Sequence, residues 1–168
     1  MIKYLTLLLC ICFTSCAGYQ LSGAKPTHLG HVKSIHVPLF KNRTLLTRAE
    51  SYATNSALDA LTRDGTYTMA SASHADAVLK GSVSKVNFGR VSASRDDRQT
   101  TEELSMTITI SWQLLDQANS LAVLEQGQST GRTRFFAGDN LHVARTNALP
   151  DALRRASEAM TSRLADGF

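Results

Sequence analysis

Between Leu104 and Leu115 apolar and polar side chains alternate, and this run constrains the fold more than any other segment. The apolar positions are Leu104, Met106, Ile108, Ile110, Trp112 and Leu114. The positions between them carry short neutral polar side chains, namely Ser105, Thr107, Thr109, Ser111 and Gln113. A period of two is typical of a half-buried strand in an antiparallel sheet. The run therefore predicts a sheet with one face on a core and one open polar face.

The segments around this run predict partner strands. Residues 77–91 precede it and residues 121–136 follow it after a DQANS turn, so both are expected to pair with it. Residues 32–40 form a further strand candidate. Pro38 restricts that strand to an edge position or a bulge, because proline has no N–H to donate. A short strand is also expected at 66–70.

The first helix is predicted after the strand candidate at 32–40. Thr44 or Thr47 could cap it, and it runs to about Asp64, where Gly65 suits a left-handed stop. Its apolar positions recur at spacings of three and four, at Leu46, Ala49, Ala53, Ala57, Ala60 and Leu61. This spacing places them on one face of a helix.

The second helix is predicted at the end of the chain. Asp139 or Asn140 can cap it, and Pro150 either starts its main part or kinks it. Its apolar stripe consists of Leu149, Leu153, Ala156, Met160 and Leu164. Together the elements predict an α+β fold, with two amphipathic helices packed on one face of a four-stranded, mixed and mostly antiparallel sheet.

Composition limits the classes of protein that remain. The chain has 168 residues, 43% of them hydrophobic and 19% charged, which suits one domain with a real core. All three cysteines, Cys10, Cys12 and Cys16, lie in the first 16 residues. A disulfide framework, a cysteine-based zinc site and a cysteine nucleophile in the body of the protein are therefore excluded.

The N-terminus has the features of a bacterial lipoprotein signal. Lys3 gives a positive start, and residues 4–13 form an apolar run of signal-peptide length, too short to span a bilayer. Thr14 and Ser15 precede Cys16, as small residues precede the acylated cysteine of a lipobox. The alternative is an ordinary secretory signal with an incidental cysteine.

These features divide the chain into three parts. We expect a signal peptide at 1–15, a lipidated tether at 16–31 and one α+β domain at 32–168. Ala17 stands where aspartate would mark retention at the inner membrane, so we expect a lipid anchor in the outer membrane, on its periplasmic side.

Catalytic signals are missing from the sequence. No nucleophile-elbow, phosphate-loop or metalloprotease motif occurs, so we expect no catalytic residues, no cofactor and no enzyme. His28, His31 and His36 are close in sequence, but two of them fall in the expected tether, and no metal site is predicted. Nucleic-acid binding is not expected either, because charge is modest (+4) and no stacking aromatics accompany the basic residues.

Arginines are the remaining candidates for binding. Arg90, Arg95 and Arg98 lie in or beside a long loop between two predicted strands, and Arg132 and Arg134 share one face of the next strand. The planar guanidinium suits phosphate groups, so these five are the candidate contacts for an anionic head group such as that of lipopolysaccharide. The alternative is a solvated polar face in which nearby acidic side chains are their partners.

Several segments together resemble the LptE family of lipopolysaccharide-assembly lipoproteins. They are CAGYQLSG at 16–23, VKSIHVPLFKNRT at 32–44, ESYATNSALDALTRDGTY at 50–67 and ADAVLKGSVSKV at 75–86. The resemblance covers the first half of the mature chain well and the second half by element order. It implies two helices against a four-stranded sheet, and a plug and chaperone for the LptD-type β-barrel that inserts lipopolysaccharide into the outer leaflet.

A rival resemblance belongs to another functional class. SIHVPLFKNRT also looks like the opening strand of the curli-secretion and TolB-amino-domain group, whose small lipoproteins activate peptidoglycan synthases. The Gly18–Tyr19 start and the short tether favour the resemblance to the LptE family. About 15 extended residues reach at most ~50 Å, which keeps the domain beside the membrane.

Overall fold

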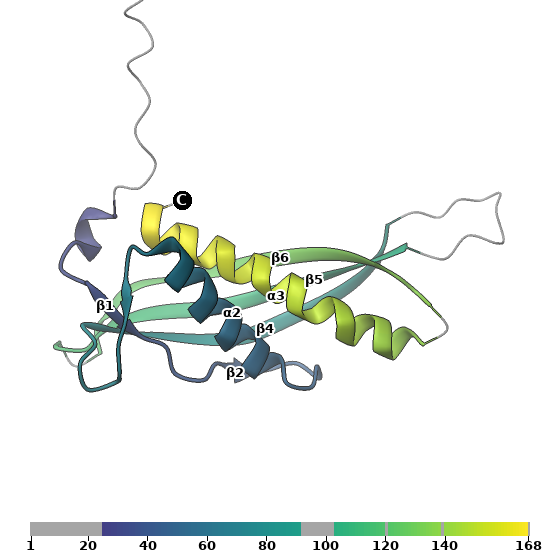
Figure 1. The fold of residues 1–168 in the computed structure, drawn as a ribbon, viewed down its shortest axis with the longest axis horizontal. Coiled ribbons are helices and arrows are strands. Elements are labelled where there is room, and N and C mark those ends of the chain that lie inside the picture. Colours follow the sequence, from purple (N-terminus) through teal and green to yellow (C-terminus); the bar gives the residue numbers. More distant parts are fainter. Residues whose placement is uncertain (1–24, 92–102, 120, 139, 168) are drawn as a thin grey trace, which may run out of the picture.

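Three strands of 14 residues each form the body of the sheet: β4 (Ala77–Arg90), β5 (Glu103–Asp116) and β6 (Val123–Phe136). This computed structural model describes residues 25–91, 103–119, 121–138 and 140–167 (Figure 1). Strand β5 lies between β4 and β6 and pairs with both in antiparallel register. The alternating run and its two neighbours are therefore confirmed as a meander.

The sheet has six strands, so the prediction of four was wrong. The other three are short: β1 (Ser34–His36), β2 (Lys41–Asn42) and β3 (Thr68–Met69). β1 and β2 each pair in parallel with β4, and β3 pairs in parallel with β1. The sheet is mixed, as expected, with its long strands antiparallel.

The strand expected at 32–40 is divided in two around Pro38. β1 ends at His36 and β2 begins at Lys41. Between them the Phe40 N–H leaves the sheet and donates to Thr54 Oγ1 at 2.9 Å, on the first helix. Because Pro38 cannot donate and Phe40 donates elsewhere, the pairing with β4 is interrupted here.

The first helix, α2 (Ala49–Asp64), ends as predicted and begins later than predicted. Gly65 has φ of 79° and its N–H donates to the Leu61 carbonyl. The predicted caps Thr44 and Thr47 are wrong, because Arg48 precedes the helix with φ of 62° and without a side-chain cap. Thr44 Oγ1 instead accepts from Leu46 N (3.3 Å), in the turn before the helix.

The second helix, α3 (Leu141–Asp166), has 26 residues and contains Pro150. Its predicted cap is confirmed at Asn140, whose side chain accepts from Val143 N at 3.1 Å; Asp139 lies outside the described residues. The helix runs through Pro150 and does not start there.

Both helices lie on one face of the sheet, in front of it in Figure 1. α3 packs on β6 and β5, and α2 packs on α3 and β4. Trp112 is 2% exposed between these layers and donates from Nε1 to Ser129 Oγ at 3.1 Å. The apolar side of the alternating run thus forms the core, as predicted.

The folded body begins before Val32. A 3₁₀ turn, η1 (Thr27–Leu29), places the Leu29 side chain in the core with no exposed surface. Lys25 Nζ lies 4.2 Å from the centroid of the Tyr67 ring. Within the described ranges, no helix is both long and apolar enough to cross a bilayer.

Candidate functional site

The face of the sheet that points away from the helices is polar. Residues paired directly across antiparallel strands share a face, so the register of the three long strands defines it. Rows across β4, β5 and β6 are Lys80–Gln113–Gln126, Ser82–Ser111–Gln128, Lys85–Thr109–Thr130 and Asn87–Thr107–Arg132. We call this surface the outer face.

Hydrogen bonds between neighbouring strands order the side chains of the outer face. Ser111 Oγ donates to Ser84 Oγ at 2.9 Å, and Ser84 Oγ donates to the Thr109 carbonyl at 3.1 Å. Gln113 Nε2 donates to Gln126 Oε1 at 3.0 Å. The polar positions predicted from the alternating run therefore lie together on one face that neither helix covers.

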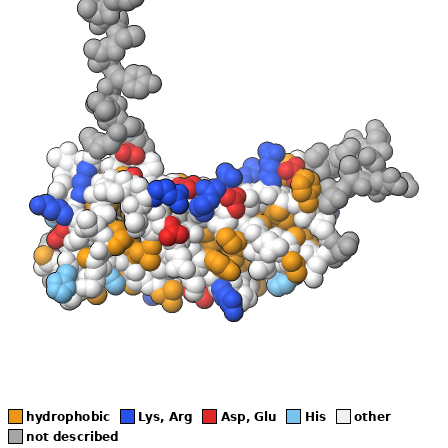
Figure 2. All heavy atoms as spheres, viewed as in Figure 1, with side chains coloured by type: hydrophobic (Ala, Val, Ile, Leu, Met, Phe, Trp, Pro, Cys, Tyr) orange, Lys and Arg blue, Asp and Glu red, His pale blue; other side chains and the backbone are white. Residues whose placement is uncertain are grey.

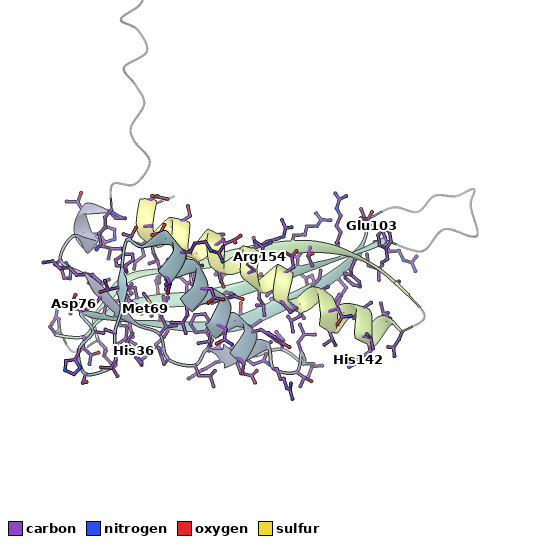
Figure 3. The ribbon with its side chains drawn as sticks, viewed as in Figure 1. His36, Met69, Asp76, Glu103, His142 and Arg154 are labelled. Carbon is purple, nitrogen blue, oxygen red and sulfur yellow. The ribbon has the colours of Figure 1, made fainter. Side chains whose placement is uncertain are left out.

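Two of the predicted arginines lie side by side on the outer face. Arg132 is opposite Thr107 and Arg134 is opposite Ser105. Arg132 Nη2 donates to Ser105 Oγ at 3.4 Å, and Arg134 Nη1 lies 3.9 Å from Glu103 Oε1. Figure 3 labels Glu103 at this end of the sheet, far from Asp76 at the other end. This ion pair is long and the Arg134 side chain is 64% exposed, so its guanidinium remains open to another anion.

The other predicted contacts are not brought to the same surface. Arg90 pairs with Leu104, so the register places it on the helix side of the sheet, opposite to Arg132 and Arg134. Arg95, Arg98 and Cys16 lie outside the described residues.

An apolar hollow lies beside Arg132 and Arg134, and the sequence did not predict it. Phe136 is 64% exposed there, and a cavity of about 540 Å³ lies between the end of β6 and the first turns of α3. Figure 2 shows hydrophobic side chains at this end of the molecule. Nearby, the Arg145 guanidinium lies 4.2 Å from the centroid of the Phe88 ring. Two consecutive aromatics at the end of a strand, Phe135 and Phe136, were the available signal, since only one of them can face the core.

A larger groove of about 820 Å³ opens on the other half of the outer face. Its rim is the segment 38–43, and its floor consists of the outer positions of β4, β5 and β6 around Ser82, Ser111 and Gln128. Lys41, Arg43 and Lys80 line it, and none of the described residues around it is acidic. The sequence reading missed these cations. The available signal was the spacing of two from Leu39 through Lys41 to Arg43, which puts all three on one side of an extended chain.

Ion pairs elsewhere are concentrated on α3. In Figure 2, basic and acidic side chains lie together along the upper edge of the view, over α3 and β6. Arg154 and Arg155 both bond Asp151, at 2.6 Å and 2.9 Å. A hydrogen bond from the Thr133 hydroxyl of β6, together with the two arginines, lowers the pKa of Asp151 to about 2. This carboxylate therefore joins α3 to β6.

The histidines are dispersed. His28 Nε2 lies 2.7 Å from Glu125 Oε2, His36 Nδ1 lies 3.2 Å from the Ala70 carbonyl, and His74 contacts Ser71 and Ser73. In the part of the chain that the structure describes, no three His, Cys, Asp or Glu side chains are grouped as metal ligands.

Two helices on one face of a mixed sheet, with the other face open, define a class of small α+β proteins. The chain resembles protein XCC0632 from Xanthomonas campestris (TM-score 0.56, 15% identity, covering 86% of this chain and 89% of that one). It also resembles the hypothetical protein CT253 from Chlamydia trachomatis (TM-score 0.54, 6% identity, 82% and 99% covered). A minor lipoprotein from Acinetobacter baumannii is similar as well (TM-score 0.50, 10% identity, 80% and 93% covered). At these identities the likeness concerns the fold.

The family follows from the sequence itself. Residues 32–166 match the family model LptE, described as lipopolysaccharide-assembly. This protein belongs to the LptE family, which confirms the resemblance and extends it through the second half of the chain. No curated protein sequence matches the chain significantly.

Proposed function

We propose that this protein is a lipid-anchored lipoprotein on the periplasmic side of the outer membrane. It plugs an LptD-type β-barrel translocon and assists the assembly of lipopolysaccharide in the outer leaflet. The observation that carries the proposal is the uncovered polar face of β4, β5 and β6, in a chain of the lipopolysaccharide-assembly family. The role is binding and assembly, without catalysis and without a cofactor.

The outer face has the chemistry that a barrel lumen requires. Its central positions, Thr107, Thr109 and Ser111, carry short neutral side chains that can bond either water or a polar wall. Such groups exchange one hydrogen-bond partner for another at little cost. The helix side could not serve, because its apolar residues are already in the core.

The anchor in this proposal is Cys16. Mass spectrometry of the mature protein should find an N-terminal diacylglyceryl-cysteine, since small residues precede this cysteine and no cysteine follows it. An unmodified N-terminus at another residue, or a wild-type protein free of the membrane, would contradict the proposed anchor.

Arg95, Arg98, Arg132 and Arg134 are the proposed lipopolysaccharide contacts. Two double variants test them: Arg95→Glu with Arg98→Glu, and Arg132→Glu with Arg134→Glu. Each lost charge-assisted contact should cost on the order of 1.5–3 kcal/mol of binding free energy, and the added repulsion should increase the loss. Lys33→Glu reverses a charge at the residue before β1 and serves as the control, because Lys33 has no contact with Arg132 or Arg134.

Binding of purified lipopolysaccharide at low salt measures the effect, with circular dichroism to check the fold. Equal binding by the wild type and both double variants would show that these arginines are solvated surface residues. The plug role would then rest on the outer face alone.

The second candidate function is activation of a peptidoglycan synthase. Its support was the SIHVPLFKNRT segment, and the family match over 32–166 favours the first proposal. The two proposals name different partners, a β-barrel and a murein synthase, so identification of the bound partner separates them.

A further inference from the structure

We propose that the groove between the segment 38–43 and the outer face binds an anionic sugar, meaning a saccharide that carries phosphate or carboxylate groups. The groove lies on the half of the outer face away from Arg132 and Arg134, and neither of these arginines lines it. The inference does not depend on the proposed function, because it follows from the charge and chemistry of the groove.

The register of the sheet gathers three cations in the groove. β2 pairs in parallel with β4 so that Lys41 lies beside Ser82, two residues from Lys80 on the same face. Arg43 follows Lys41 by two positions and lines the same groove. None of these three side chains forms an ion pair or a hydrogen bond with another described residue, and all three are exposed. Unpaired like charges that share a concave surface attract an anion.

The floor of the groove supplies the hydrogen bonds that sugar hydroxyls require. Ser82 and Ser111 carry hydroxyls, and Gln113, Gln126 and Gln128 carry amides. Each of these side chains can both donate and accept. The bond from Gln113 Nε2 to Gln126 Oε1 does not use Gln113 Oε1 or Gln126 Nε2, so these two atoms remain for a ligand. A sugar hydroxyl has the same dual character.

The rim adds an apolar surface. Leu39 is 65% exposed there, next to Pro38. The C–H face of a sugar ring can pack on such side chains while its hydroxyls bond the floor. The volume of about 820 Å³ is in the range of small-molecule pockets and has room for more than one sugar ring.

An acidic peptide fits this groove less well than a saccharide. An extended peptide binds a sheet by pairing its backbone with an open edge. The floor of the groove is the middle of the sheet, where β5 has already paired with β4 and β6 on both sides. The backbone groups of a peptide would therefore find only side chains here.

Isothermal titration calorimetry tests the proposal on the full-length protein in non-ionic detergent, without barrel or lipopolysaccharide. The probes are trehalose 6-phosphate and trigalacturonic acid, with trehalose and maltotriose as their neutral counterparts. Inorganic phosphate and hexaglutamate are the competing anions. We expect at least one of the two acidic saccharides to bind more tightly than its neutral counterpart, inorganic phosphate and hexaglutamate.

Variants locate the binding. Lys80→Gln and Arg43→Gln should each weaken the affinity for the acidic saccharide by about tenfold or more, because each removes one charge-assisted contact. Lys85→Gln is the matched control: it removes a cation from the outer face of the same strand, outside the groove, and should leave affinity unchanged. Urea unfolding of each variant checks that the fold is retained.

Several results would overturn the proposal. If neutral saccharides bind as tightly as acidic ones, the cations of the groove have no role in binding. Inorganic phosphate or hexaglutamate that binds as tightly as the sugars would indicate an anion site or a peptide site. Equal losses in the Lys80→Gln and Lys85→Gln proteins would place the binding elsewhere. None of these results bears on the partner named in the proposed function.

Discussion

At the scale of single residues, Gly131 sets how closely α3 approaches the sheet. It lies on the helix side of β6, and a Cβ at this position would overlap the backbone of α3 at Ala152 and Ala156. A backbone obstacle cannot rotate away as a flexible side chain can, so the whole helix would have to shift. We predict that Gly131→Ala lowers the free energy of unfolding by about 1–3 kcal/mol, measured by urea denaturation.

Gly138 provides the control for this prediction. A Cβ there would meet nothing within 4 Å, so Gly138→Ala should change stability little. Equal stabilities of the two variants would mean that α3 does not lie against Gly131. The sequence could not predict this role, because it depends on the distance between a helix and a strand, which is fixed only in the assembled fold.

Asp151 makes the contact between α3 and β6 depend on pH. Its pKa is lowered from 3.8 to about 2, so its contribution to stability is present above pH ~4 and is lost as the pH falls toward 2. Because the side chain is 36% exposed, solvent screening reduces that contribution to about 1 kcal/mol or less.

We predict that Asp151→Asn lowers the free energy of unfolding at pH 7 by about 1 kcal/mol or less, and that the difference from wild type vanishes near pH 2. Urea unfolding at both pH values measures it. A difference of the same size at pH 7 and pH 2 would show that the carboxylate's charge is not what matters.

At the scale of elements, side-chain periodicity predicted the long strands and both helices. The strand at 104–115 was predicted correctly because its alternation reflects the burial of one face of the sheet. The short strands were harder to delimit, because two or three residues carry no periodicity. β1 and β2 pair with the edge of β4, and β3 pairs with β1. The start of α2 was missed for a related reason: the Thr44 hydroxyl bonds within the preceding turn instead of capping the helix.

The start of α3 gives a prediction about one element. Asn140 caps this helix, whose first turn holds no acidic residue. Asn140→Ala should therefore cost about 1 kcal/mol of stability. Asn140→Asp should retain or raise stability, because the carboxylate still accepts the bond and its charge favours the helix N-terminus. Thermal unfolding followed by circular dichroism measures both; equal losses in the two variants would contradict a capping role.

At the scale of the whole molecule, the open polar face was predictable and the groups on it were not. Strand alternation placed Thr107 and Ser111 on the outer face, and the spacing of two placed Arg132 beside Arg134. The groove forms only where segments 38–43, 80–82 and 126–128 come together in the fold. No pattern within any one of these segments predicts that contact. Arg90 differed from expectation because the register of β4 against β5, rather than its place in the sequence, decides its face.

In the proposed function the outer face contacts a β-barrel. Site-specific photocrosslinking tests this contact most directly, with a benzophenone amino acid in place of Thr107 or Thr130 in cells, and unirradiated cells as the control. These neighbouring positions lie in the middle of the outer face, on β5 and β6. We predict that both positions crosslink to an outer-membrane β-barrel of the LptD type, identified by mass spectrometry. Crosslinks to a peptidoglycan synthase, or no crosslink to a barrel from either position, would contradict the account.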